Sequence, residues 1–157
     1  MPPSGEPVKE LILQDLETTI AAIAAGSDYY TTVQEVTRLE AEPTTVSRYP
    51  VVILSPLGTD YDQPGTSTVN TITGHYRVRA TLIVRTRTDT ALAVERFVRD
   101  VQKSILVDVT RGGRAIDTYM TSDDVFYPTE LNEPVAGADC VILVNYRTKR
   151  TDLNTPS

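Results

Sequence analysis

The sequence predicts an α+β domain: a mixed, mainly antiparallel β-sheet of about five strands with two helices packed on one face. Two segments repeat apolar residues at helical spacing, and five others alternate or run apolar as β-strands do. The connections between them are mostly short or polar, so a sheet with both helices on one face buries all the apolar stripes. A chain of 157 residues is long enough for one such domain. We expect a flexible tail at 1–6, the domain at 7–148 and a C-terminal arm at 149–157.

The first helix is expected to begin at Pro7 and to end at Gly26, because proline suits the first helical turn and glycine suits the end. Its apolar residues recur on one side at Val8, Ile12, Leu16, Ile20 and Ile23. Two strands are expected next. Tyr29–Glu40 is rich in β-forming residues. Pro50–Pro56 is a short apolar run, typical of a strand that is covered on both faces.

A polar segment, Leu57–Thr73, comes before the next strand. It contains Gly, Pro, Asp, Thr and Ser and little apolar material, so we expect a loop. A loop of this length in a compact domain typically binds something or is disordered. We predict that it is mobile in a free subunit and is ordered by a neighbour. The residues expected to act in such assembly are Asp60, Tyr61, Asp62, Gln63 and Pro64.

The segment Gly74–Arg87, GHYRVRATLIVRTR, alternates as a long strand with one dry face does. The even-numbered residues are apolar and are expected to meet the helices. The other face holds four arginines, the arginine stripe: Arg77, Arg79, Arg85 and Arg87. The chain's own helices leave this face uncovered. Its partner is water with neighbouring acids, another protein surface, or nucleic acid.

The remaining elements are a second helix and two closing strands. Asp89 is expected to cap the helix, whose apolar residues recur as far as Ile105. The sequence RGGR at 111–114 then ends it in a turn. Strands are expected at 115–128 and 139–148, separated by the turn-rich TELNEPVAGA. The final residues, KRTDLNTPS, have no apolar periodicity and are expected to form the arm.

Charge is distributed in blocks. The formal net charge of −6 argues against nucleic acid as the main ligand. Residues 77–114 hold nine basic and four acidic side chains, whereas residues 115–139 hold six acids and no base. These blocks are either a neutral consequence of a folded surface or complementary patches. Opposite patches on different faces favour head-to-tail contacts between copies, which can close a ring. The candidate partners of the arginine stripe are Asp117, Asp123, Asp124, Glu130 and Glu133.

No catalytic, cofactor or metal motif stands out in the sequence. The one histidine, His75, is not accompanied by a nucleophile frame such as Gly-x-Ser-x-Gly. The one cysteine, Cys140, is expected to be a small buried apolar residue. Asp123 and Asp124 are adjacent, so on a strand they point to opposite faces, which is poor geometry for a shared metal. No apolar run approaches the ~20 residues that cross a bilayer. We expect a protein that is not an enzyme, with no cofactor and no membrane partner.

The order of segments resembles the tail terminator (tail completion) proteins of long-tailed bacteriophages. The likeness spans roughly residues 8–150. It rests on the order of these features along the chain. An opening helix is followed by the segment VQEVTRLEAEPTTVSRYPVVIL and then by a polar loop. After the loop come the segment YRVRATLIVRTRTDTALAVERFVRDVQKSIL, the segment GGRAIDT and a final strand that contains VNYRT. The family-like element is a long strand that feeds a helix and is followed by the closing strands.

The resemblance implies a subunit of a hexameric ring that caps the finished tail tube, stops its growth and offers the surface for joining to the head connector. The implied partners are other copies of the chain, the tail tube protein and a head-completion or neck protein. Genome DNA would pass through the lumen without sequence readout. The implied location is the tail–neck region of the virion, after assembly in the host cytoplasm. Two alternatives stay open: a head-side neck or head-completion protein, and a non-phage cytosolic binding module.

Overall fold

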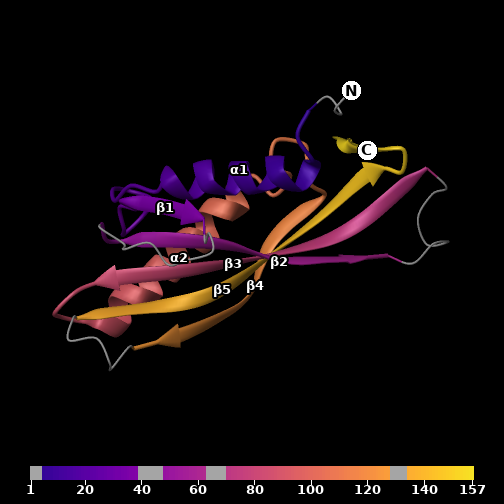
Figure 1. Ribbon diagram of the computed structural model, residues 1–157. Coiled ribbons are helices and arrows are strands. Elements are labelled where there is room, and N and C mark those ends of the chain that lie inside the picture. Colours follow the sequence, from indigo (N-terminus) through magenta and orange to yellow (C-terminus); the bar gives the residue numbers. More distant parts are fainter. Residues whose placement is uncertain (1–4, 39–47, 63–69, 128–133) are drawn as a thin grey trace.

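The computed structural model describes residues 5–38, 48–62, 70–127 and 134–157. The elements in this part of the chain are, in order, α1 (Val8–Ala21), β1 (Glu35–Arg38), β2 (Val51–Tyr61), β3 (Thr71–Arg85), α2 (Thr90–Val107), β4 (Asp117–Phe126), β5 (Val135–Lys149) and β6 (Asp152–Pro156) (Figure 1).

The strands form one mixed sheet in the order β1-β2-β3-β5-β4, and β6 pairs with the end of β5. Only β1 and β2 are parallel, and all the other pairs are antiparallel. The centre of the sheet is the long pair of β3 and β5, in register from Thr71 opposite Lys149 to Arg85 opposite Val135. Figure 1 shows a strong twist, since β2, β3 and β5 cross one another in the view. The predicted fold class is confirmed.

The core lies between one face of this sheet and both helices. The even-numbered residues of β3, predicted to be its dry face, are buried: Tyr76, Val78, Ala80, Leu82 and Val84. They join one apolar cluster with Ile12 and Leu16 of α1 and Phe97 and Val101 of α2. Burying each large apolar side chain stabilises the fold by about 1.5–3 kcal/mol. Cys140 is buried in the same cluster, as expected.

The helix ends differ from prediction. Helix α1 begins after Pro7, whose carbonyl accepts from the amides of Glu10 and Leu11 at 2.9 and 3.1 Å, but it ends at Ala21, before Gly26. Asp89 occupies the N-cap position of α2, as expected, but its side chain makes no capping hydrogen bond. Its backbone is left-handed, with φ 48°, whereas capping side chains reach the first-turn amides from an extended backbone.

The first predicted strand is much shorter than the segment Tyr29–Glu40 suggests. Of the described residues in this segment, Glu35–Arg38 pair as β1, while residues 39 and 40 lie outside the described part. The reason lies on α2, where the buried carboxylate of Asp100 accepts from the backbone amides of Tyr30 and Thr31, both at 2.8 Å. Amides held in this way are not available to a strand ladder, so the β-forming composition is overridden.

The predicted loop Leu57–Thr73 is largely a hairpin. Strand β2 continues to Tyr61 and β3 already begins at Thr71, while residues 63–69 lie outside the described part. Among the described residues, β1 pairs with β2 as far as Leu54, so Pro56 lies beyond the last of these pairs, where a missing amide is tolerated. The register then shifts between Pro56 and Gly58, and Gly58 has φ 121°, a backbone that glycine adopts without strain.

Strand β4 is shorter than the predicted 115–128, whereas the strands that follow it extend beyond the prediction. Strand β5 begins at Val135, inside the segment expected to be a turn, and extends to Lys149. The expected arm at 149–157 forms β6, and the amide of Ser157 donates to the carbonyl of Arg147 at 3.1 Å. A strand that is held mainly by backbone pairing needs no apolar periodicity, which is why the sequence pattern did not reveal it.

Candidate functional site

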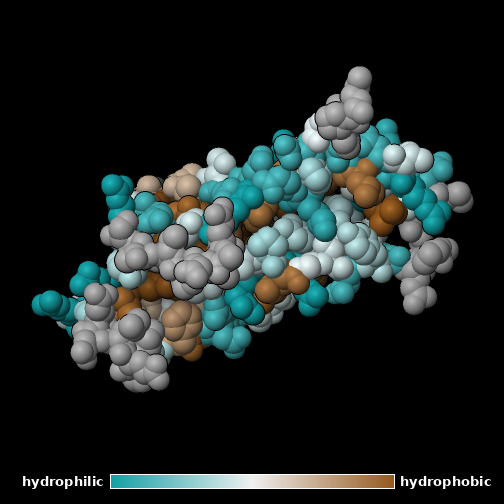
Figure 2. All heavy atoms as spheres, in the orientation of Figure 1, coloured by the Kyte–Doolittle hydropathy of each residue, from teal (hydrophilic) through white to brown (hydrophobic). Residues whose placement is uncertain are grey.

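The candidate site is the open face, the side of the sheet turned away from the apolar cluster and both helices. In strand order β2-β3-β5-β4, the pairing registers define four successive rows across it. They are Ile53-Thr81-Asp139-Asp124, Ser55-Arg79-Val141-Ser122, Gly58-Arg77-Leu143-Tyr119 and Asp60-His75-Asn145-Asp117. Four apolar residues of this face, Ile53, Ile83, Val141 and Leu143, are only half-buried. The apolar patches that are visible in Figure 2 are small and framed by hydrophilic atoms.

The arginine stripe lies where the alternation predicts. Arg77, Arg79 and Arg85 are exposed on the open face, and Arg87 is exposed just beyond the end of β3. Arg77 pairs with Asp60 of β2 at 3.5 Å, with side-chain exposures of 45% and 73%. Such an exposed pair stabilises by about 0–1 kcal/mol. Arg79, Arg85 and Arg87 form no ion pair with the residues that the structure describes.

His75 is held between two polar side chains of the open face. Its Nδ1 lies 2.6 Å from Oδ1 of Asn145, and its Nε2 lies 2.8 Å from Oδ1 of Asp62. The contacts to Asn145 and then to Asp62 raise the pKa of His75, against a smaller effect of burial. The histidine therefore links β5, β3 and the end of β2, and its protonation strengthens that link.

The candidate acids divide between the two sides of the sheet. Asp124 is exposed on the open face opposite Asp139, whereas Asp123 is exposed on the other side, opposite Cys140. The prediction that Asp123 and Asp124 point to opposite faces is therefore confirmed. Asp117 lies on the open face, half-buried, and accepts from the Thr118 amide at 2.9 Å. The other two candidates, Glu130 and Glu133, lie outside the described residues.

The residues expected to act in assembly do not form one loop. Asp60 and Tyr61 belong to β2, and the amide of Asp62 donates to the carbonyl of Thr73 at 3.1 Å. Asp60 faces Arg77 and Asp62 faces His75, so both acids already have partners within the chain. Gln63 and Pro64 lie outside the described residues.

Two buried charges escaped the sequence reasoning. Asp100 fixes residues 30 and 31 on α2, as described above. Arg111 is fully buried in the RGGR turn with a left-handed backbone, φ 51°. Its guanidinium lies 3.1 Å from Asp15 of α1 and donates to the carbonyls of Ile105, at 2.6 Å, and Asp108. Burial lowers the pKa of Arg111, and Asp15 opposes that shift. No local pattern marks either residue, because each is buried by segments distant in the chain.

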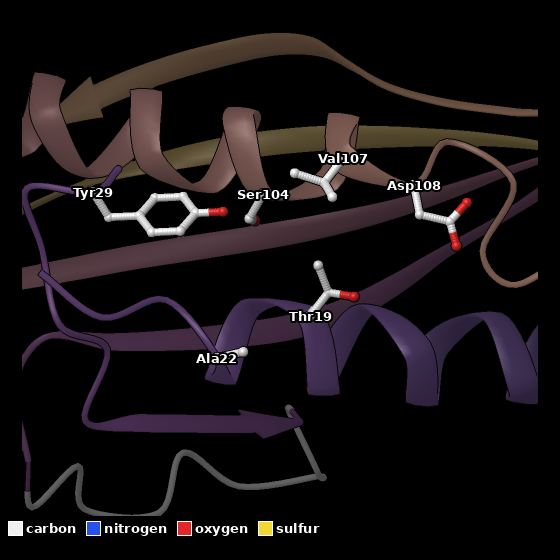
Figure 3. Close-up of a pocket in the computed structure, with 6 residues that line it drawn as sticks. All are labelled: Thr19, Ala22, Tyr29, Ser104, Val107 and Asp108. Atoms are coloured by element: carbon white, nitrogen blue, oxygen red, sulfur yellow. The ribbon is translucent and has the colours of Figure 1, made fainter. Parts of the chain in front are cut away.

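A groove of about 220 Å³ lies between α1 and α2 (Figure 3). Its lining residues are Thr19, Ala22, Tyr29, Ser104, Val107 and Asp108. The Ser104 hydroxyl donates to the carbonyl of Val101 at 2.8 Å, and the Asp108 carboxylate accepts from the amides of Thr110 and Gly112 at 2.9 and 2.7 Å. These polar groups serve the end of α2, so we place the candidate site on the open face and not in the groove.

Within the described ranges, no group of three or more His, Cys, Asp or Glu side chains is placed to hold a metal ion. In the same part of the chain, no helix is long and apolar enough to cross a membrane. No protein-family model matches the chain, and no curated protein matches its sequence.

Proposed function

We propose that this protein is a phage structural subunit that forms a ring on the end of the tail tube, ends tube growth and provides the surface for joining to the head. The order of segments that resembles tail terminators supports this proposal. So does the α+β architecture with both helices on one side, since it leaves a broad sheet face available for another protein.

The observation that carries the proposal is the composition of the open face. Half-buried apolar residues, Ile83, Val141 and Leu143, lie among arginines on neighbouring positions of β3 and β5. Arginine is enriched at protein interfaces, because its rigid fork binds carboxylates and its stem covers apolar surface. A face built only for water needs no half-buried apolar centre. Contact with a copy of the chain or with the tube protein would cover that centre and pair the arginines.

The test is tail assembly with charge-reversed variants. One variant carries Arg77→Glu and Arg79→Glu, and a second carries Arg85→Glu and Arg87→Glu. The exposed side chains predict that both variants fold, which thermal melting checks. A tail tube protein is polymerised with each variant, and tube length and end rings are measured by electron microscopy. We expect the parent chain to give capped tubes of limited length and the variants to give uncapped, overlong tubes.

Arg96→Glu is the matched control, because Arg96 is exposed on α2, across the sheet from the arginine stripe. It is expected to cap tubes as the parent chain does. If both stripe variants fold and still cap tubes, the arginine stripe is a solvated face. If the parent chain binds heads and never tube ends, the head-completion alternative replaces the proposed function.

A further inference from the structure

Opposite charges flank β5 on the open face. Strand β3, on one side, presents Arg77 and Arg79, and strand β4, on the other side, presents Asp117 and Asp124. The positions in between on β5 are the half-buried Val141 and Leu143. Because β3 and β4 are two strands apart, the arginines and these acids are separated by about 10 Å across the sheet. That separation keeps them from pairing within one copy.

The acids of the open face include one unfavourable pair. Asp124 of β4 lies directly opposite Asp139 of β5, and like charges in that position destabilise a sheet. Asp139 accepts a hydrogen bond from the Thr81 hydroxyl at 2.6 Å, and neither carboxylate forms an ion pair within the described residues. A cation supplied from outside the subunit would relieve this repulsion. Arg79, one row away on β3, is itself exposed and without an ion pair in the same part of the chain.

We infer that the open faces of two copies pack on each other about a two-fold axis that runs along β5, so that Arg79 of each copy lies over Ser122 of the other and reaches Asp124 and Asp139 in the neighbouring row. A half-turn about such an axis places β3 of one copy over β4 of its partner, and the reverse, while β5 faces β5. The rotation does not shift either copy along the strand direction, so each row of one copy lies over the same row of the other. Each arginine therefore reaches acids one row away, about 7 Å along the strand.

The same half-turn also brings other residues of the open face into contact with the second copy. Val141 and Leu143 of one copy meet those of the other and form an apolar centre. Arg77 comes to lie over the ring of Tyr119, which is 39% exposed, with Asp117 one row beyond. The two Asp139 carboxylates approach each other near the axis, and the two Arg79 side chains flank them.

Charge selects this axis over the alternative two-fold arrangement. A half-turn about an axis across the strands would stack β3 on β3 and β4 on β4, which opposes arginine to arginine and aspartate to aspartate. The three strands that overlap, β3, β5 and β4, and the four rows span about 400 Å² on each copy, from strand spacings of about 4.8 Å and row spacings of about 7 Å, while β2 lies beyond the partner's edge strand β4. Stable interfaces bury about 800 Å² on each partner, so the pair is weak and depends on concentration.

This inference deepens the proposed function, since it names a second copy as a partner of the same face. The pair is closed by its symmetry and is not the ring. It covers β3, β5 and β4 of the open face of the free protein, and the contact with the tube end replaces it. Pairing and tube capping are measured separately, so failure of one is distinguishable from failure of the other.

The test is the mass of the free protein across a concentration series, by sedimentation, with two single variants. Arg79→Glu opposes two acids and Asp124→Arg opposes an arginine, so each is expected to raise the dissociation constant of the pair at least ~10-fold. Mixing the two variants restores pairing, because the introduced glutamate of one copy then faces the introduced arginine of the other, while the unchanged Arg79 faces the unchanged Asp124. The mass of the mixed complex is expected to correspond to two copies, one of each variant. Matched controls on α2, Arg96→Glu and Glu95→Arg, leave pairing unchanged.

Three results would overturn the inference. The parent protein could stay monomeric at its highest soluble concentration. The mixture of variants could pair no better than each variant alone while both melt as the parent does. The mass could grow past two copies in the free protein, which would indicate a head-to-tail contact. If pairing fails and tubes are still capped, the proposed function stands without this inference.

Discussion

Replacement of Asp100 by alanine tests how the segment before β1 is held. The Asp100 carboxylate is fully buried and accepts from the amides of Tyr30 and Thr31, both at 2.8 Å, and from Arg99 at 3.0 Å. Asp100→Ala removes the acceptor of two backbone amides. The side chain of Tyr30 continues to pack, since its ring centroid lies 4.9 Å from the Arg96 guanidinium. The change therefore removes the two amide hydrogen bonds together with the partly exposed ion pair to Arg99.

The expected loss of stability follows from those two bonds. A hydrogen bond to a charged group contributes about 1.5–3 kcal/mol, which gives about 3–6 kcal/mol for two. Tyr30 is 59% exposed, so water reaches the freed amides and offsets part of the loss. We expect about 2–4 kcal/mol. For a chain of this size, about 2–4 °C of melting temperature is lost per kcal/mol, so Tm should fall by about 4–16 °C. Asp100→Asn keeps an oxygen acceptor without the charge and should lose less.

The assay is thermal melting combined with hydrogen exchange at residues 30 and 31. Asp28→Ala is the matched control, because its carboxylate is 71% exposed and pairs only with Lys103, at 3.1 Å. That control should change stability by less than ~1 kcal/mol. If Asp100→Ala melts within ~2 °C of the parent protein, or if the two amides stay equally protected, the carboxylate does not hold this segment and the reasoning fails.

Three further changes test other parts of the structure. The contacts of His75 raise its pKa, so the stabilisation that they supply is present below the pKa of the unfolded state, about 6.5, and is lost as pH rises through the pKa of the folded state. Urea unfolding should therefore show a larger loss of stability for His75→Gln at pH 5.5 than at pH 8. The reverse order would contradict the contacts described. Gly137→Ala would push a methyl group into the backbone oxygen of Leu82, with the Phe126 ring at 2.7 Å, and should lower the unfolding free energy by about 2–3 kcal/mol. In the control Gly26→Ala the added methyl group meets open space, so the unfolding free energy should be unchanged. Burial raises the pKa of Cys140 to about 12, so thiol reagents should label the native protein only as fast as it unfolds, and prompt labelling would show that the core is open there.

The sequence predicted the elements whose side chains alternate against one core. The alternation along Gly74–Arg87 placed the arginine stripe on the open face, and helical spacing located α1 and α2. Such patterns are readable because the backbone repeats every two residues in a strand and every 3.6 in a helix, so burial leaves a local period. For the same reason, the adjacent pair Asp123 and Asp124 was correctly divided between the two faces.

Tertiary structure alone decided the features that depend on distant partners. Asp100 shortens β1 through amides 70 residues away in the chain, and Arg111 is buried because α1 brings Asp15 to it. The register of β4 on β5 sets Asp124 opposite Asp139 and two strands away from Arg79. A local pattern tells which face a residue occupies, but pairing across the sheet is fixed by long-range packing, and so the rows of the open face could not be predicted from the sequence.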